Sequence, residues 1–153
     1  MSEQRFLRGL GAGILATIAM SIVMIAGTVS GISPMPKPIP VAIAARILGT
    51  GISKPALMAV GAIAHLLYGG VFAGLLAVMT FPVTVRKGIL LGAILWLAMQ
   101  LLWLPFLGWG IFGTAVTPKI AGATLLLHVI YGGTAGWLMD RGARDGQRIP
   151  ARA

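Results

Sequence analysis

Apolar residues fill four long stretches of the chain, and short segments rich in proline, glycine and basic residues separate them. The stretches run from Gly9 to Val29, Pro55 to about Thr80, Gly88 to about Leu107 and Pro118 to about Met139. A helix rises about 1.5 Å per residue, so about 20 apolar residues cross a hydrocarbon core that is about 30 Å thick. The pattern therefore predicts an all-α protein, a bundle of four transmembrane helices.

The segment between the first two stretches contains alternating prolines, which prevent a regular helix and favour an extended strap. These prolines are Pro34, Pro36, Pro38 and Pro40. The residues from Val41 to Leu48 follow, and Gly49 and Gly51 end them. Because this piece is too short to cross a bilayer, it predicts a helical turn at the membrane interface.

The composition is that of a membrane protein. Of the 153 residues, 58% are hydrophobic and 10% are charged, whereas soluble domains have about 45–50% and about 25%. The net charge of +9 comes from basic residues that lie almost entirely between and beyond the apolar stretches. We assign them to membrane topology and lipid headgroups, and we expect the lipid bilayer and no nucleic acid as the partner. The absence of cysteine excludes disulfides and thiol chemistry.

Basic residues are divided unevenly between the two sides of a four-helix topology. The side with both termini and the middle loop has Arg5, Arg8, Arg86, Lys87, Arg141, Arg144, Arg148 and Arg152. The opposite side has Lys37, Arg46, Lys54 and Lys119. Since basic segments are retained in the cytoplasm, this distribution predicts that both termini are cytoplasmic.

The sequence matches itself at two offsets. A shift of 79 positions places Gly9 on Gly88, Gly13 on Gly92 and Met20 on Met99. A shift of 63 positions aligns the second and fourth stretches, placing Pro55 on Pro118, His65 on His128, Tyr68 on Tyr131, Gly69 on Gly132 and Gly70 on Gly133. Both histidines and both tyrosines of the chain fall into register, which indicates a duplicated helical hairpin.

We therefore interpret residues 1–153 as a single integral membrane domain made of two parallel-repeat helical hairpins. Repeat 1 covers about residues 6–82, with the strap at 33–54, and repeat 2 covers about residues 85–141. Gly9, Gly13, Thr17 and Ser21 recur every four residues, which predicts a face of close interhelical contact. Because the small-residue faces of the second and fourth helices correspond, we expect those two helices to be neighbours.

Two histidines lie deep in the predicted spans. Each follows the proline that begins its helix by ten residues, about 15 Å along the axis and so near the bilayer midplane. Polar side chains at this depth face the interior of a bundle. We expect an interior polar cluster formed by Thr17, Ser21, His65, Tyr68, Gln100, Thr124, His128 and Tyr131.

Three interpretations of the histidine pair remain open. In the first, the imidazoles bind no cofactor and fix helix packing through hydrogen bonds to Gln100, Ser21, Thr17 or a tyrosine hydroxyl. In the second, His65 and His128 are the axial ligands of one haem b in an electron-transfer protein, and the neighbouring glycines make room for the macrocycle. In the third, they are a protonatable pair in a proton or solute path, although the three acidic residues are all near the chain ends.

Catalytic sites of soluble enzymes are not indicated. A zinc site uses three or four ligands, and two histidines without carboxylates are too few. A hydrolase triad needs an acid beside its serine and histidine, and no acidic residue lies inside a span. We therefore expect a non-enzymatic membrane module, acting as a homo-oligomer or as a subunit of a larger membrane complex.

The second half of the chain also carries a recognisable order of residues. Its features are Arg86, Lys87, Gly88, Leu90, Leu91, Gly92 and Ala93, then Pro105 and Gly108, then Gly122 and His128, and finally Asp140, Arg141 and Arg144. This order resembles the YagU-like families of small bacterial and archaeal inner-membrane proteins of unknown function. The resemblance implies a protein of a prokaryotic cytoplasmic (inner) membrane without an assigned activity.

Overall fold

The computed structural model describes residues 2–49 and 51–148, with side chains described for all of these except 145–148. This part of the chain is helical and contains no strand. Four long helices dominate it: α1 (Ser2–Val29), α3 (Lys54–Met79), α4 (Val85–Ala98) with its continuation to Phe106, and α6 (Lys119–Arg148). Each is long and apolar enough to cross a membrane, which confirms the predicted fold class and indicates a multi-pass membrane protein.

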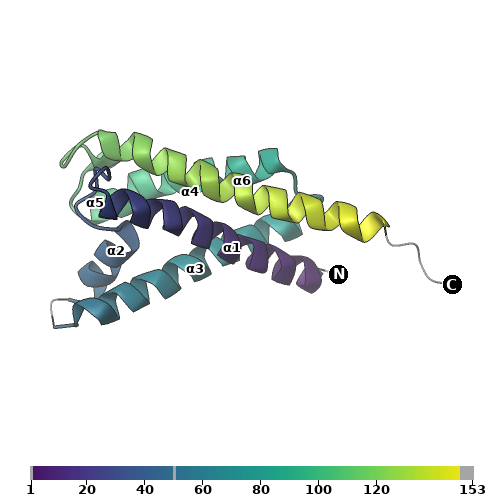
Figure 1. Ribbon diagram of the computed structural model, residues 1–153, viewed down its shortest axis with the longest axis horizontal. Helices are drawn as coiled ribbons and strands as arrows, with labels where there is room; N and C mark the ends of the chain where they lie inside the picture. The colour runs from purple at the N-terminus through teal and green to yellow at the C-terminus, as the bar shows by residue number, and fades with distance from the viewer. Residues whose placement is uncertain (1, 50, 149–153) are drawn as a thin grey trace.

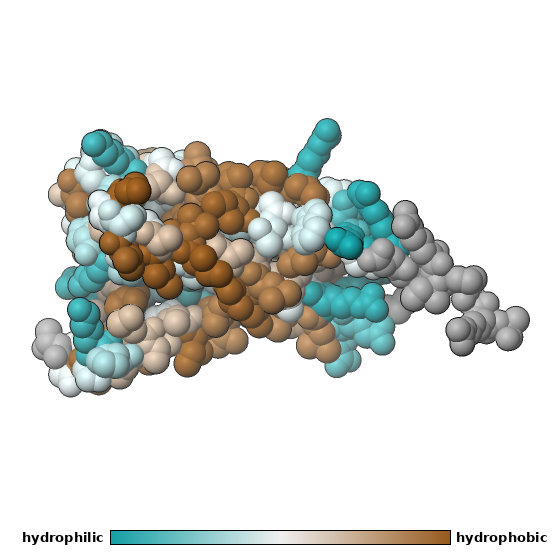
Figure 2. Space-filling view, in the orientation of Figure 1, coloured by the Kyte–Doolittle hydropathy of each residue, from teal (hydrophilic) through white to brown (hydrophobic). Residues whose placement is uncertain are grey.

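The four helices lie side by side, and the start of α1 and the end of α6 are at the same end of the bundle (Figure 1). Apolar side chains cover the middle of the molecule in Figure 2, and hydrophilic ones gather at its two ends. Many large apolar residues of the described chain are exposed, including Leu15, Ile22, Leu102 and Leu126. An apolar belt between two polar ends is the surface that a bilayer requires.

Helix α1 packs against α3 through small residues of both helices. A Cβ atom on Gly9 would lie 2.7 Å from the carbonyl oxygen of Ala73 and 2.8 Å from the Cα of Gly74. A Cβ atom on Gly13 would collide with the carbonyl oxygen of Gly69. The predicted small-residue face of the first span is therefore confirmed as an interhelical contact, and its partner is α3.

Helix α4 packs against α6 in the same manner. Gly88 faces the carbonyl oxygen of Gly132, and Gly92 faces the carbonyl oxygen of His128, too closely for a side chain in either case. The Trp96 indole nitrogen on α4 also donates a 3.1 Å hydrogen bond to the carbonyl oxygen of Ala121 on α6. The chain thus forms two tightly packed hairpins, α1 with α3 and α4 with α6.

The hairpins meet mainly where α1 packs against α6, while α3 makes few contacts with α4 and fewer with α6. The expectation that the second and fourth helices are direct neighbours was therefore wrong. Its premise was that the glycines of these helices face each other. Instead Gly132 is packed against Gly88 of α4, and Gly69 is packed against Thr17 of α1 and the Tyr131 ring of α6, so the two glycines do not meet.

The strap leads into α2 (Ile39–Leu48), which begins two residues before the predicted helical turn and ends at Gly49, where φ is 83°. α2 packs against α3, and Gly61 lies against the backbone of Pro40, where a Cβ atom would be 2.9 Å from the Pro40 carbonyl oxygen. In Figure 1, α2 lies between α1 and α3 where these two helices diverge. It therefore fills the wide end of the first hairpin.

The third span changes its helical form near its middle. After α4, residues Met99–Trp103 form a π-helical turn, η1, and Leu104–Phe106 form the short helix α5. The backbone N–H of Leu104 donates to the carbonyl of Met99, five residues earlier. Pro105 cannot donate a backbone hydrogen bond, which favours an irregular turn just before it. Gln100 lies within this π turn and is fully buried.

Candidate functional site

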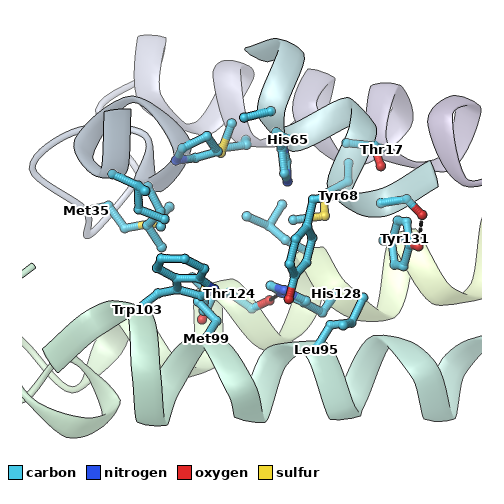
Figure 3. Close-up of a pocket in the computed structure, with 18 of the residues that line it drawn as sticks. Thr17, Met35, His65, Tyr68, Leu95, Met99, Trp103, Thr124, His128 and Tyr131 are labelled. Carbon is cyan, nitrogen blue, oxygen red and sulfur yellow. Dashed lines mark hydrogen bonds between the residues drawn. The ribbon is translucent and has the colours of Figure 1, made fainter. Parts of the chain in front are cut away.

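A cavity of about 310 Å³ lies between the two hairpins. α1, α2, α3, α4 with η1, and α6 all contribute to its walls, and most of the lining is apolar. Residues of α3 and α4 line it together, and these two helices make few direct contacts with each other. Figure 3 shows His65 and His128 on opposite walls, with Met35, Met99 and Trp103 toward one end.

His65 projects from α3. Its Nδ1 atom lies 3.4 Å from the hydroxyl oxygen of Ser21 on α1, a long hydrogen bond that links the two helices of the first hairpin. Because a hydroxyl can either donate or accept, this contact does not decide which ring nitrogen of His65 carries the hydrogen. The other ring nitrogen, Nε2, has no hydrogen-bond partner among the described residues.

His128 projects from α6 and is only 8% exposed. Its Nδ1 atom lies 2.8 Å from the carbonyl oxygen of Thr124, one helical turn earlier. A carbonyl oxygen can only accept, so Nδ1 must carry the hydrogen and donate it. In an uncharged imidazole, Nε2 then keeps its lone pair, and no described residue donates to it.

Thr124 connects His128 to the third span. Its hydroxyl accepts a 2.9 Å hydrogen bond from Nε2 of Gln100 and donates to the carbonyl oxygen of Ile120 at 2.7 Å. Gln100 is fully buried, and its Oε1 atom has no hydrogen-bond partner within the described part of the chain. A polar network therefore runs from η1 through α6 to the edge of the cavity.

The two tyrosines have different environments although they occupy matching sequence positions. The Tyr131 hydroxyl donates a 2.6 Å hydrogen bond to the carbonyl oxygen of Gly69, joining α6 to α3. Tyr68 is only partly buried, lines the cavity, and packs against Phe72 with ring centroids 4.7 Å apart. Thr17 also lines the cavity and donates to the carbonyl oxygen of Gly13 at 2.8 Å.

The structure brings the eight residues of the expected polar cluster into one region. Six of them line the cavity: Thr17, His65, Tyr68, Thr124, His128 and Tyr131. Ser21 and Gln100 stand behind this lining and contact His65 and Thr124 respectively. The helices to which these residues belong are those that the sequence predicted.

Comparison with protein families gives a match to a family of unknown function, DUF6789, over residues 3–149. The chain belongs to this family. Comparisons with curated proteins and with solved structures give no match. The YagU-like resemblance is not confirmed by these comparisons, and membership of DUF6789 likewise assigns no activity.

Sequence reasoning missed the apolar part of the site in this DUF6789 protein. Four of its eight methionines line the cavity: Met20, Met24, Met35 and Met99. One signal was present, because the shift of 79 positions that aligns the first and third helices places Met20 on Met99. The contribution of the strap and α2, through Met35, Ile43 and Ile47, had no comparable signal.

The chemistry of the lining restricts what this member of the family can hold. Among the residues that the structure describes, no lysine, arginine, aspartate or glutamate lines the cavity. No group of three or more His, Cys, Asp or Glu side chains that could hold a metal ion occurs among the residues for which side chains are described. Apolar walls with a few hydrogen-bonding groups are typical of sites for small, largely apolar molecules.

Proposed function

We propose that the protein is a non-enzymatic module of the cytoplasmic membrane that holds a small, largely apolar molecule between its two hairpins. The observation that carries this proposal is the apolar cavity with His65 and His128 on opposite walls. Its volume of about 310 Å³ lies at the lower end of the range of about 300–1,000 Å³ that ligand pockets occupy. The occupant therefore has the size of one or two fused rings or a short branched chain.

The walls suit an occupant that arrives from the bilayer. Ala64 and Ile47 line the cavity and are also exposed on the outside of the bundle, so the cavity reaches the surface that faces lipid. Met20, Met24, Met35 and Met99 supply flexible, polarisable side chains that can adjust to the shape of a ligand. Proteins with such methionine-rich surfaces can repack around different ligands.

Haem b is the second candidate, because His65 and His128 each engage Nδ1 and leave Nε2 without a described partner. A metal-binding histidine commonly has its other nitrogen held in this way. Three features argue against haem. The cavity is small for a macrocycle, no cation among the described residues lines it to pair with the propionates, and Gly61 and Gly132 pack against neighbouring backbones and do not open space.

The remaining proposals concern the context of the module. We propose that the two hairpins are parallel repeats, that both termini are cytoplasmic, and that the protein acts as a homo-oligomer or within a larger membrane complex. The eight-to-four distribution of basic residues supports the orientation. A proton or solute path is not favoured, because no acidic residue lines the cavity or lies near the histidines in sequence.

The methionines provide a direct test of ligand binding. Protein labelled with ¹³C at the methionine methyl groups is purified in detergent and titrated with 2-methoxynaphthalene, followed by methyl NMR. We expect the signals of Met20, Met24, Met35 and Met99 to shift, while those of the exposed Met58 and Met79 stay in place. Equal shifts at all methionines would indicate partition into the micelle and would contradict the proposal.

A matched pair of variants on α3 supplies the control. Ala64→Phe adds bulk at the opening of the cavity, whereas Ala62→Phe adds the same bulk at an exposed position that does not line it. Binding should be lost in the first variant and kept in the second. The same preparations test haem, because a Soret band that His65→Ala and His128→Ala each abolish would replace this proposal with the haem one.

A further inference from the structure

We infer that the ligand of this cavity carries an uncharged hydrogen-bond donor, in the simplest case a hydroxyl group, and that this group donates a hydrogen bond to Nε2 of His128. The inference rests on the proposed function and names the chemical class of its ligand. A phenol, a quinol or an apolar alcohol has the required donor, whereas a quinone, a ketone, an ether or a hydrocarbon does not.

The direction of the hydrogen bond follows from the partner of Nδ1. The Thr124 carbonyl oxygen, 2.8 Å away, has no hydrogen to give, so Nδ1 of His128 is the donor. No carboxylate of the described residues lines the cavity to stabilise an imidazolium. The uncharged ring therefore presents the Nε2 lone pair, which must receive a hydrogen from its partner.

The surrounding structure leaves this acceptor available. His128 lines the cavity. Its Nε2 atom has no hydrogen-bond partner among the described residues, and the protein does not fully enclose it. An unfilled acceptor in apolar surroundings weakens any ligand that cannot satisfy it. A ligand with a hydroxyl at this point satisfies it, so the site discriminates between an alcohol and its ether.

His65 does not impose the same requirement. Its Nδ1 contact is with the Ser21 hydroxyl at 3.4 Å, which can act in either direction. His65 can therefore present either a donor or an acceptor to the cavity. The two histidines occupy matching positions of the proposed repeat, and only His128 requires the ligand to donate a hydrogen bond.

Two probes of the same shape test the inference: 2-naphthol, which has a hydroxyl donor, and 2-methoxynaphthalene, which has none. Dissociation constants come from the methionine methyl titration described above. We expect 2-naphthol to bind roughly fivefold more tightly, the ratio that one net hydrogen bond provides. In His128→Phe the ring is kept and the acceptor is lost, so the two probes should bind equally. In His65→Phe the preference for 2-naphthol should remain.

The outcomes separate the inference from the proposal on which it rests. Equal affinities in the unmodified protein would overturn the hydroxyl requirement and leave the apolar cavity as a ligand site. Absence of binding by either probe would overturn the proposed function itself. A preference that survives in His128→Phe, or one that disappears in His65→Phe, would overturn the assignment to His128. Retained binding of 2-methoxynaphthalene in each variant shows that the cavity is still folded.

Discussion

The Tyr131 hydroxyl on α6 donates a 2.6 Å hydrogen bond to the carbonyl oxygen of Gly69 on α3. This bond links two helices that make few other contacts with each other. Tyr131 is 3% exposed and belongs to the main apolar cluster. It therefore forms one wall of the cavity and holds α3 and α6 at a fixed separation, close enough for one side chain to bridge them.

Removing that hydroxyl should weaken the association of the hairpins. We expect Tyr131→Phe to lower the free energy of unfolding by about 0.6–1.5 kcal/mol, the range for one hydrogen bond in a membrane bundle or a protein core. Tyr68→Phe is the comparison variant, because the Tyr68 hydroxyl interacts with the Trp103 side chain and donates to no buried backbone carbonyl of another helix, so its loss should change stability less. Unfolding by SDS in mixed micelles measures both. A larger loss in Tyr68→Phe would contradict the bridging role of Tyr131.

The first and last predicted apolar stretches are shorter than the helices that contain them. The first helix begins at Ser2, seven residues before the apolar stretch at Gly9, and the last continues to Arg148, beyond Met139. Apolar patterning reports the part of a helix that lies in hydrocarbon, and it cannot report the polar turns beyond. At the end of α6, Arg144 pairs with Asp140 at 2.6 Å, a contact that supports those turns.

The glycine contacts give the second prediction. Gly92 of α4 faces the carbonyl oxygen of His128 with no room for a side chain, whereas Gly122 of α6 has nothing within 4 Å of its Cβ position. We expect Gly92→Ala to cost about 1–3 kcal/mol through overpacking. Gly122→Ala should change stability by no more than about 0.5 kcal/mol. The same SDS unfolding measures both, and equal effects would argue against close packing of α4 on α6.

The way in which the two hairpins pack together was less predictable than the pairing of helices within each hairpin. The repeat aligns Gly13 with Gly92 and Gly69 with Gly132. In the structure Gly13 faces Gly69, but Gly92 faces His128, one helical turn before Gly132. The register of a glycine face can shift by a turn while the sequence pattern stays the same, since the small residues recur at about that spacing. The sequence pattern does not encode this register. It also does not encode which helices form the interface between the two hairpins.

Membrane orientation gives the third prediction. Because the chain has no cysteine, single cysteines can be introduced without a background. Thr114→Cys and Ser53→Cys lie at exposed positions in the loops opposite the termini, and both should react with an impermeant maleimide in intact cells. Ser2→Cys should react only after permeabilisation, as the basic residues near the termini predict. The reverse pattern would invert the orientation, and uniform labelling would contradict four spans.

The polar residues of the site were predictable as a group because their cost in a bilayer requires partners inside the bundle. Their partners were not. No π turn was predicted in the third span, whereas Met99–Trp103 forms one, and it contains the Gln100 that bonds Thr124. The role of α2 was also missed, since Ile43 lines the cavity from an element that was expected at the membrane interface. The π turn follows from the local effect of Pro105, whereas the place of α2 depends on its packing against α3.

Gln100 and Thr124 give the last prediction, which depends on the difference between losing a hydrogen bond and leaving a buried group without one. In Thr124→Val, Nε2 of the fully buried Gln100 loses its acceptor, and the amide already has no described partner at Oε1. We expect a cost of about 1–3 kcal/mol, the penalty for a stranded buried donor. Gln100→Leu removes the whole amide, while Thr124 still bonds the Ile120 carbonyl, so its cost should be smaller. The double variant Gln100→Leu with Thr124→Val should then be more stable than Thr124→Val alone, because no amide is left stranded. SDS unfolding of the three variants measures this order. A Gln100→Leu variant less stable than Thr124→Val would mean that the amide contributes more than its bond to Thr124, as it would if a water molecule or the ligand donated to Oε1.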